Sequence, residues 1–99
     1  MKTSFTARHF QASEDLKNFC LDSVEKLEHF FDRIMSCDIV LEPVPDDDNP
    51  QKAEINVKVP GSFFNASESA PSYEQAIGEV VDNVARQLKK FKNKNYNNY

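Results

Sequence analysis

The side chains that could carry out chemistry in this chain are two histidines, two cysteines and sixteen carboxylates. Neither His9 nor His29 has a cysteine or an acid at the spacing of a metal site, and the chain has no glycine-rich phosphate loop and no nucleophile elbow. Catalysis requires a nucleophile with a paired base or a shaped pocket, and the sequence indicates neither. We therefore predict that the protein is not an enzyme and uses no metal, no cofactor and no small-molecule substrate.

The cysteines and the acidic run at residues 46–48 also favour structural interpretations. Cys20 and Cys37 each lie among apolar neighbours without a C-x-x-C spacing, which is typical of reduced, buried thiols. The three consecutive aspartates lack the spaced oxygen ligands, the central glycine and the closing glutamate of a calcium loop. We interpret the cysteines as packing residues and the aspartates as a solvated turn.

Charge is unevenly distributed along the chain. The net charge of -4 argues against a nucleic-acid partner, because phosphate binding normally requires a basic excess. However, residues 1–82 contain all sixteen acids, whereas residues 83–99 contain five of the twelve basic residues and no acid. This pattern suits a phosphate-binding segment, and it equally suits lysines that complement the C-terminal end of a helix. Charge alone leaves both interpretations open.

The elements that position these residues follow from hydrophobic periodicity. Alternation of apolar and polar residues predicts strands, and apolar residues at spacings of three and four predict helices. The predicted strands are residues 3–9, 37–41, 53–59 and 63–67, and the predicted helices are residues 14–33 and 72–91. Ser13 and Ser72 are the expected N-caps, and Pro60-Gly61 predicts a tight turn between the last two strands.

The order β-α-β-β-β-α predicts an α+β fold with a mostly antiparallel four-stranded sheet and both helices on one face. We expect one domain over residues 1–92 and a flexible polar tail over residues 93–99. No apolar run approaches the ~18 residues of a membrane helix, and the N-terminus lacks the apolar region of a signal peptide. The expected location is therefore the cytoplasm, without a membrane partner.

Basic side chains are predicted to share exposed faces of the two helices. At about 100° per residue, the group on the first helix falls within an arc of ~60° on one flank of the apolar stripe, and the group on the second helix falls within an arc of ~100° roughly opposite its stripe. The two groups are Lys26, His29 and Arg33 on the first helix, and Arg86, Lys89 and Lys90 on the second.

Four segments of the chain match a known family in order and in one register over residues 2–92. They are FTARHF (residues 5–10), VEKLEHFFDRI (24–34), KAEINVKVPG (52–61) and, within residues 73–90, YxxAI followed by RQLKK. Together they resemble the ribosome hibernation-promoting factor family, also called ribosome-associated inhibitor, ribosomal subunit interface protein or sigma-54 modulation protein. The chain resembles the short type, which lacks a further C-terminal domain.

The resemblance implies a fold similar to that of double-stranded RNA-binding domains. It implies binding to 16S rRNA in the small ribosomal subunit, within the channel for messenger RNA and transfer RNA, so that translation stops in stationary or starved cells. It also implies a monomer when the protein is off the ribosome. The positions that match rRNA-binding bases of the family are Lys26, Arg33, Arg86, Lys89 and Lys90, with Arg8, His9, His29 and Lys92 as further candidates.

A second hypothesis is a protein-binding module of related fold that uses its exposed sheet face or sheet edge and does not bind RNA. The acidic total charge suits this alternative. Competition by bulk RNA separates the two hypotheses, because only an RNA-binding protein would be displaced from ribosomes.

Overall fold

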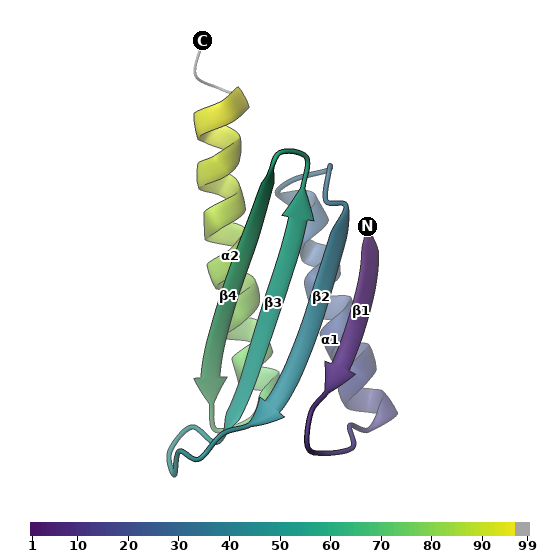
Figure 1. The fold of residues 1–99 in the computed structure, drawn as a ribbon, viewed down its shortest axis with the longest axis vertical. Coiled ribbons are helices and arrows are strands. Elements are labelled where there is room, and N and C mark those ends of the chain that lie inside the picture. Colours follow the sequence, from purple (N-terminus) through teal and green to yellow (C-terminus); the bar gives the residue numbers. More distant parts are fainter. Residues whose placement is uncertain (97–99) are drawn as a thin grey trace.

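Four strands form one sheet in the order β1-β2-β3-β4, and two helices cover one of its faces (Figure 1). The structure, a computed structural model, describes residues 1–96. Its elements are β1 (Lys2–Ala7), α1 (Glu14–Glu25), the 3-10 helix η1 (Lys26–His29), β2 (Ser36–Pro43), β3 (Gln51–Val59), β4 (Ser62–Ala70) and α2 (Tyr73–Tyr96). The predicted α+β class and element order are confirmed.

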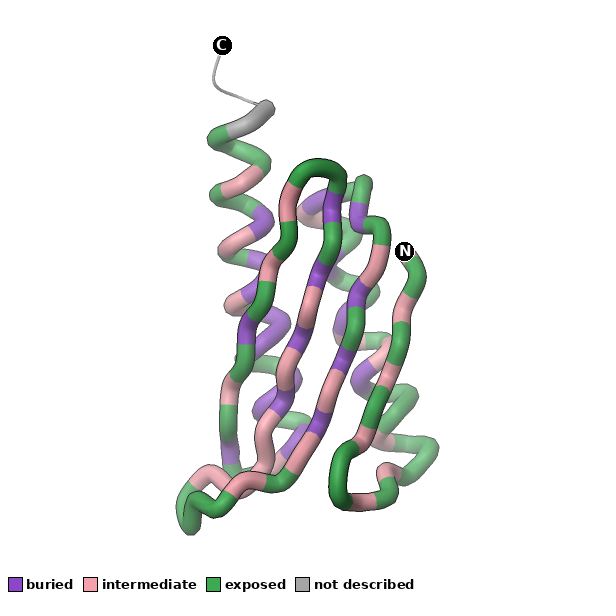
Figure 2. Tube along the Cα trace, in the orientation of Figure 1, coloured by how far each residue is buried: buried purple, intermediate pink, exposed green. Residues whose placement is uncertain are grey.

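The sheet is mixed, which agrees with the prediction of a mostly antiparallel sheet. β1 pairs with β2 in parallel, whereas the β2-β3 and β3-β4 pairs are antiparallel. Side chains on successive residues of a strand point to opposite faces, so alternate residues of the central strands face the helices. Ile39, Ile55 and Val57 are fully buried there, and the alternation is visible along the strands in Figure 2.

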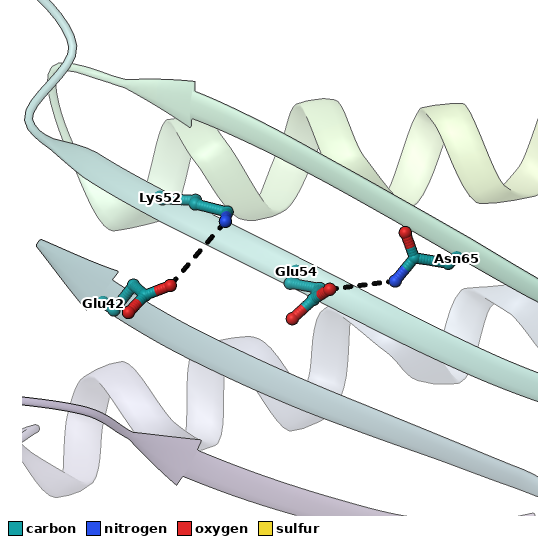
Figure 3. A network of polar contacts seen from close by, with 4 residues as sticks. All are labelled: Glu42, Lys52, Glu54 and Asn65. Atoms are coloured by element: carbon teal, nitrogen blue, oxygen red, sulfur yellow. Dashed lines mark hydrogen bonds and ion pairs between the residues drawn. The ribbon is translucent and has the colours of Figure 1, made fainter. Parts of the chain in front are cut away.

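The other face of the sheet carries polar side chains and has no helix over it. Lys52 Nζ lies 3.7 Å from Glu42 Oε1, and Asn65 Nδ2 donates a hydrogen bond of 2.9 Å to Glu54 Oε2 (Figure 3). Cross-strand pairs of this kind stabilise a solvated sheet face modestly. Some of the polar groups of this face therefore bind to one another across neighbouring strands.

The first helix begins as predicted but ends earlier. Ser13 Oγ accepts a hydrogen bond of 3.1 Å from the Leu16 N–H, which caps α1. The prediction of one helix over residues 14–33 was wrong at its C-terminal end, because α1 stops at Glu25 and η1 stops at His29. The apolar residues of this region keep helical spacing beyond His29, so the sequence pattern does not reveal where the helix ends.

Hydrogen bonds explain how this helix terminates. The N–H groups of both Phe30 and Phe31 donate to the Leu27 carbonyl, at 3.0 and 3.2 Å. Carbonyls shared in this way are common at helix ends. The run from His29 to Asp32 also contains only residues of modest helix propensity, so little favours another helical turn.

The second helix is capped by Ser72, whose Oγ accepts a hydrogen bond of 3.1 Å from the Gln75 N–H. α2 has 24 residues and continues through Tyr96, beyond the predicted end at residue 91. At ~1.5 Å per residue it is about 36 Å long. Residues 97–99 of the predicted flexible tail lie outside the described residues, and the flexibility of the tail stays a prediction.

Both helices run in the same direction. Each begins at the end of the molecule where β1, β2 and β4 finish, and their C-terminal ends lie together at the opposite end, beside the β3-β4 turn (Figure 1). Gly61 provides that turn with a φ of 81°, a conformation that favours glycine. The loop that contains Asp46, Asp47 and Asp48 lies at the end where the helices begin.

Gly78 offers a test of helix stability in α2. A Cβ atom added at Gly78 would meet no atom within 4 Å, and the residue has no positive φ that would require glycine. We expect Gly78→Ala to raise the free energy of unfolding by about 0.5–1 kcal/mol, because glycine loses more backbone entropy in a helix. Urea denaturation measures the change. A less stable variant would show that the position requires glycine.

Candidate nucleic-acid interface

Basic side chains from η1, from the turn after it and from α2 converge where the helices end. Two adjoining surface hollows lie there, and His29, Phe30 and Lys92 line both of them. Arg33 contributes to the first hollow, which has a volume of about 360 Å³, and Lys89 contributes to the second. We call the group of His29, Arg33, Lys89 and Lys92 the basic end; all four residues are exposed.

Aromatic and aliphatic packing positions the basic end. The Phe91 ring lies 5.7 Å from the Phe31 ring and 5.4 Å from the Phe64 ring, measured between centroids. These contacts join α2 to the turn after η1 and to β4. Leu27 is fully buried and anchors η1 in the same core. The cations are therefore presented by a packed framework rather than by a free loop.

Two carboxylates also line the first hollow. Glu28 and Asp32 lie there beside Arg33 and Lys92, so this hollow is not uniformly positive. The N-terminal ammonium of Met1 lies 3.8 Å from Glu28 Oε2 and offsets part of that negative charge. The second hollow contains Lys89, Lys92 and His29 without a carboxylate, which makes it the better site for an anion.

Arg86 and Lys90 are exposed on α2 but line neither hollow. They are four residues apart and therefore share one side of the helix. They extend the positive surface from the basic end along α2. The acids of α2, by contrast, all lie in its N-terminal part, at Glu74, Glu79 and Asp82.

Three other predicted residues lie apart from the basic end. Lys26 is exposed at the start of η1 and lines a different groove, between α1 and α2, so the predicted common arc of Lys26, His29 and Arg33 is wrong. Arg8 and His9 follow β1 at the opposite end of the molecule (Figure 1). Both are exposed, and His9 has a φ of 65°. The structure does not bring them to the other candidates.

Phe30 and Asn93 are residues of the hollows that the sequence analysis did not identify. Phe30 is partly buried and lines both hollows, and Asn93 lines the second. An aromatic ring beside cations is the usual platform for a nucleic-acid base. Phe30 falls outside the apolar stripe that contains Leu27 and Phe31. An aromatic residue outside the buried stripe is the one signal in the sequence that could have identified Phe30 as part of this surface.

The two thiols have no role in this surface. Cys20 and Cys37 are both fully buried, as predicted, and neither forms a disulfide. Burial raises the pKa of each thiol from 9.0 to about 12, with a further contribution from Glu74 at Cys20 and from Asp38 at Cys37. Thiolates, which are the reactive form, are therefore disfavoured in the folded protein.

We expect the native protein to react with iodoacetamide at pH 8 at least about 100-fold more slowly than the urea-unfolded protein. The folded-state pKa of each thiol lies above its unfolded-state value. The thiols therefore contribute to the free energy of unfolding, and this contribution is fully present below pH 9 and is lost as the pH rises toward 12. Mass spectrometry of the labelled chain and urea denaturation at pH 7 and pH 10 measure the two effects. Rapid labelling of the native protein would contradict the burial of the thiols.

Among the described residues, no three His, Cys, Asp or Glu side chains are grouped closely enough to hold a metal ion. The same part of the chain contains no helix that is both long and apolar enough to span a membrane. Asp46 has a local role instead, since its Oδ1 accepts hydrogen bonds of 2.9 Å from the N–H groups of Asp48 and Asn49. This side chain orders the turn between β2 and β3.

Two solved structures share this fold over nearly the whole chain. A ribosomal subunit interface protein from Coxiella burnetii superimposes with a TM-score of 0.82 at 21% identity, over 93% of this chain and 98% of that one. The Protein Y N-terminal domain of Thermus thermophilus gives 0.80 at 22% identity, over 92% of this chain and 99% of that one. The fold is thus the α+β class found in these two proteins.

Sequence similarity then identifies the family. The Sigma 54 modulation protein / S30EA ribosomal protein family matches residues 3–96. The ribosome hibernation promoting factor of Klebsiella oxytoca is 33% identical over 94 residues, which cover 95% of this chain and 96% of that protein. The chain belongs to the Sigma 54 modulation protein / S30EA ribosomal protein family, whose members are ribosome-associated proteins and not enzymes. The predicted family and the prediction of a non-enzymatic protein are confirmed.

Proposed function

We propose that this protein is a ribosome hibernation factor that binds 16S rRNA of the small subunit through its basic end. In this role it occupies the channel for messenger RNA and transfer RNA in the cytoplasm of stationary or starved cells. The observation that carries the proposal is the convergence of His29 from η1, Arg33 from the turn after it, and Lys89 and Lys92 from α2. Family membership supports it, and so does the name of the relative from Klebsiella oxytoca.

Occupying the channel requires binding but no chemistry. Lysine and arginine form charge-assisted hydrogen bonds with phosphate oxygens, and such contacts position a protein on RNA without reading its sequence. Phe30 adds a surface on which one unstacked base can lie. Arg86 and Lys90 extend the same contact along α2, whereas Lys26, Arg8 and His9 lie outside it.

The polarity of the molecule explains how a chain of net charge -4 can bind RNA. The bases of α2 follow its acids along the helix, and the three-aspartate loop lies at the far end. Screening in physiological salt acts over about 8 Å, which is short compared with the molecule's longest extent of 47 Å. A phosphate at the basic end therefore interacts mainly with the local cations.

Co-sedimentation with isolated small and large subunits at 50 and 200 mM salt, with translation assayed on the same samples, tests the proposal. We expect binding to the small subunit that weakens steeply with salt, because each phosphate contact contributes about one unit to the slope of log affinity against log salt. Translation should stop as the subunits become occupied. Absence of binding at low salt would reject the proposal.

The sheet-face alternative has less support from the structure. The open sheet face is mostly polar, and two of its charged groups, Lys52 and Glu42, pair with one another. Displacement by bulk RNA is the discriminating measurement. If bulk RNA left the protein on the ribosome, contacts with protein through the sheet would become the better explanation.

A further inference from the structure

A groove between the two helices lies outside the basic end. It has a volume of about 470 Å³, within the range of about 300–1,000 Å³ that is common for ligand sites. Phe19, Ser23 and Lys26 line it from α1 and η1, and residues 75–82 line it from α2. The RNA-binding proposal makes no use of this groove, since it leaves Lys26 outside the RNA contact.

The bottom of the groove is apolar and open. Phe19 is 43% exposed, although its spacing places it on the predicted apolar stripe of the first helix. Gly78 lies opposite, in the middle of α2, where an added Cβ atom would have no neighbour within 4 Å and no positive φ requires glycine. Glycine at such a position costs helix stability, and neither a close neighbour nor a positive φ requires glycine here. The missing side chain leaves room for a side chain from another molecule.

The rim of the groove is acidic. Glu79 and Asp82 line it with exposed carboxylates, and neither forms an ion pair with a side chain that the structure describes. Lys26 is the one cation among the lining residues. Asp22 precedes it by four residues on the same side of the helical segment and offsets its charge. The surroundings of Phe19 and Gly78 are therefore net negative.

We infer that this interhelical groove binds a basic polypeptide segment that inserts an apolar side chain between Phe19 and Gly78. Lysine or arginine residues next to that side chain pair with Glu79 and Asp82. A buried apolar anchor with a polar, charge-complementary rim is the usual arrangement of a peptide-binding groove. RNA does not fit this chemistry, because two carboxylates would face its phosphates.

The inference does not depend on the proposed RNA contact. The groove and the basic end involve different residues of α2, since Gly78, Glu79 and Asp82 all precede Arg86. One molecule can therefore bind RNA at its basic end and a basic polypeptide along its helices. Contact with a basic polypeptide gives a function to the acidic residues Glu79 and Asp82.

The test is a titration of the ¹⁵N-labelled full chain with three synthetic twelve-residue peptides, followed by NMR. The first repeats Lys-Lys-Leu, the second replaces its leucines with serine, and the third repeats Glu-Glu-Leu. We expect the first peptide to shift the amide signals of Phe19, Gly78 and Val81. The serine peptide should bind at least tenfold more weakly, and the acidic peptide should not bind.

Two variants locate the site. Gly78→Leu places a bulky apolar side chain in the groove, at a position where an added Cβ atom has no neighbour within 4 Å, and should weaken the first peptide at least tenfold, while co-sedimentation with small subunits is unchanged. Glu79→Lys/Asp82→Lys should weaken the peptide similarly. Asp47→Lys/Asp48→Lys is the matched control, since it makes the same change in total charge in the β2-β3 loop, at residues that do not line the groove, and should leave peptide affinity intact.

Three results would overturn the inference. If Gly78→Leu left the affinity for the first peptide unchanged, the contact would be only electrostatic. Equal losses in the two double variants would show that net charge, not the groove, determines affinity. If twelve-residue oligouridylate shifted the groove signals and the Lys-Lys-Leu peptide did not, the groove would be part of the RNA surface. Loss of ribosome binding in Lys89→Gln/Lys92→Gln, with peptide binding intact, tests the proposed function separately.

Discussion

Removing two charges at the basic end, in Lys89→Gln/Lys92→Gln, should weaken binding to small ribosomal subunits by about 100-fold at moderate salt. Hydrogen bonds to charged groups contribute about 1.5–3 kcal/mol each, and about 1.4 kcal/mol corresponds to a factor of ten in affinity. The two lysines line the hollow that contains no carboxylate, so each is well placed for a phosphate. The slope of log affinity against log salt should also decrease by about two units.

Lys17→Gln/Lys52→Gln provides the control for that variant, because it removes the same charge from exposed or partly exposed lysines on α1 and β3. Sedimentation of both variants at several salt concentrations gives affinities and slopes together. We expect less than threefold weakening in the control. Equal weakening of the two variants would mean that total charge rather than the basic end governs binding, and the assigned surface would be wrong.

Truncation of Leu27 should have the largest effect on stability. Leu27 is fully buried in η1, and the N–H groups of Phe30 and Phe31 both bind its carbonyl. Leu27→Ala should lower the free energy of unfolding by about 3 kcal/mol, because it removes buried methyl groups and leaves a cavity. For a domain of this size that corresponds to a decrease in Tm of about 12–24 °C.

Met35→Ala is the comparison for Leu27→Ala, since Met35 is 52% exposed and its truncation should change stability by less than about 0.5 kcal/mol. Circular dichroism during thermal unfolding measures both variants. A decrease of less than 5 °C in Leu27→Ala would show that η1 is not anchored in the core as the structure indicates.

The presence and order of the strands and the start of each helix could be predicted from sequence because their determinants are local. Strand ends were predicted less well, since β1 ends at Ala7 rather than at residue 9 and β4 continues to Ala70 rather than ending at residue 67. Apolar and polar residues alternate from Ala53 to Val59, so one face of this strand has to be buried. Ser13 and Ser72 each precede an apolar stripe, and both cap a helix as this position indicated. The end of α1 could not be predicted in the same way. Leu27, Phe31 and Ile34 keep helical spacing although the chain has left the α-helix, since all three still reach the core.

The candidate site was only partly predictable for a related reason. Helical spacing assigned Lys89 to an exposed helix face, and Lys92 was a candidate only through the family resemblance. The proximity of both lysines to His29 depends on how α2 packs against η1. That packing arises from contacts of Phe91 with Phe31 and Phe64, which are distant in sequence. Arg8 and His9 matched the family in sequence, and only the structure places them at the other end.

The parallel course of the two helices also affects how the protein approaches its partner. The positive side chains at one end and the three aspartates at the other give the molecule an electric dipole, which the dipoles of the two parallel helices offset in part because their C-terminal ends lie at the basic end. Near a polyanion such a molecule experiences a torque that turns its positive pole forward before contact, and it is repelled in the reverse orientation. Orientation in solution would then increase the association rate constant, and added salt would slow association more than it speeds dissociation.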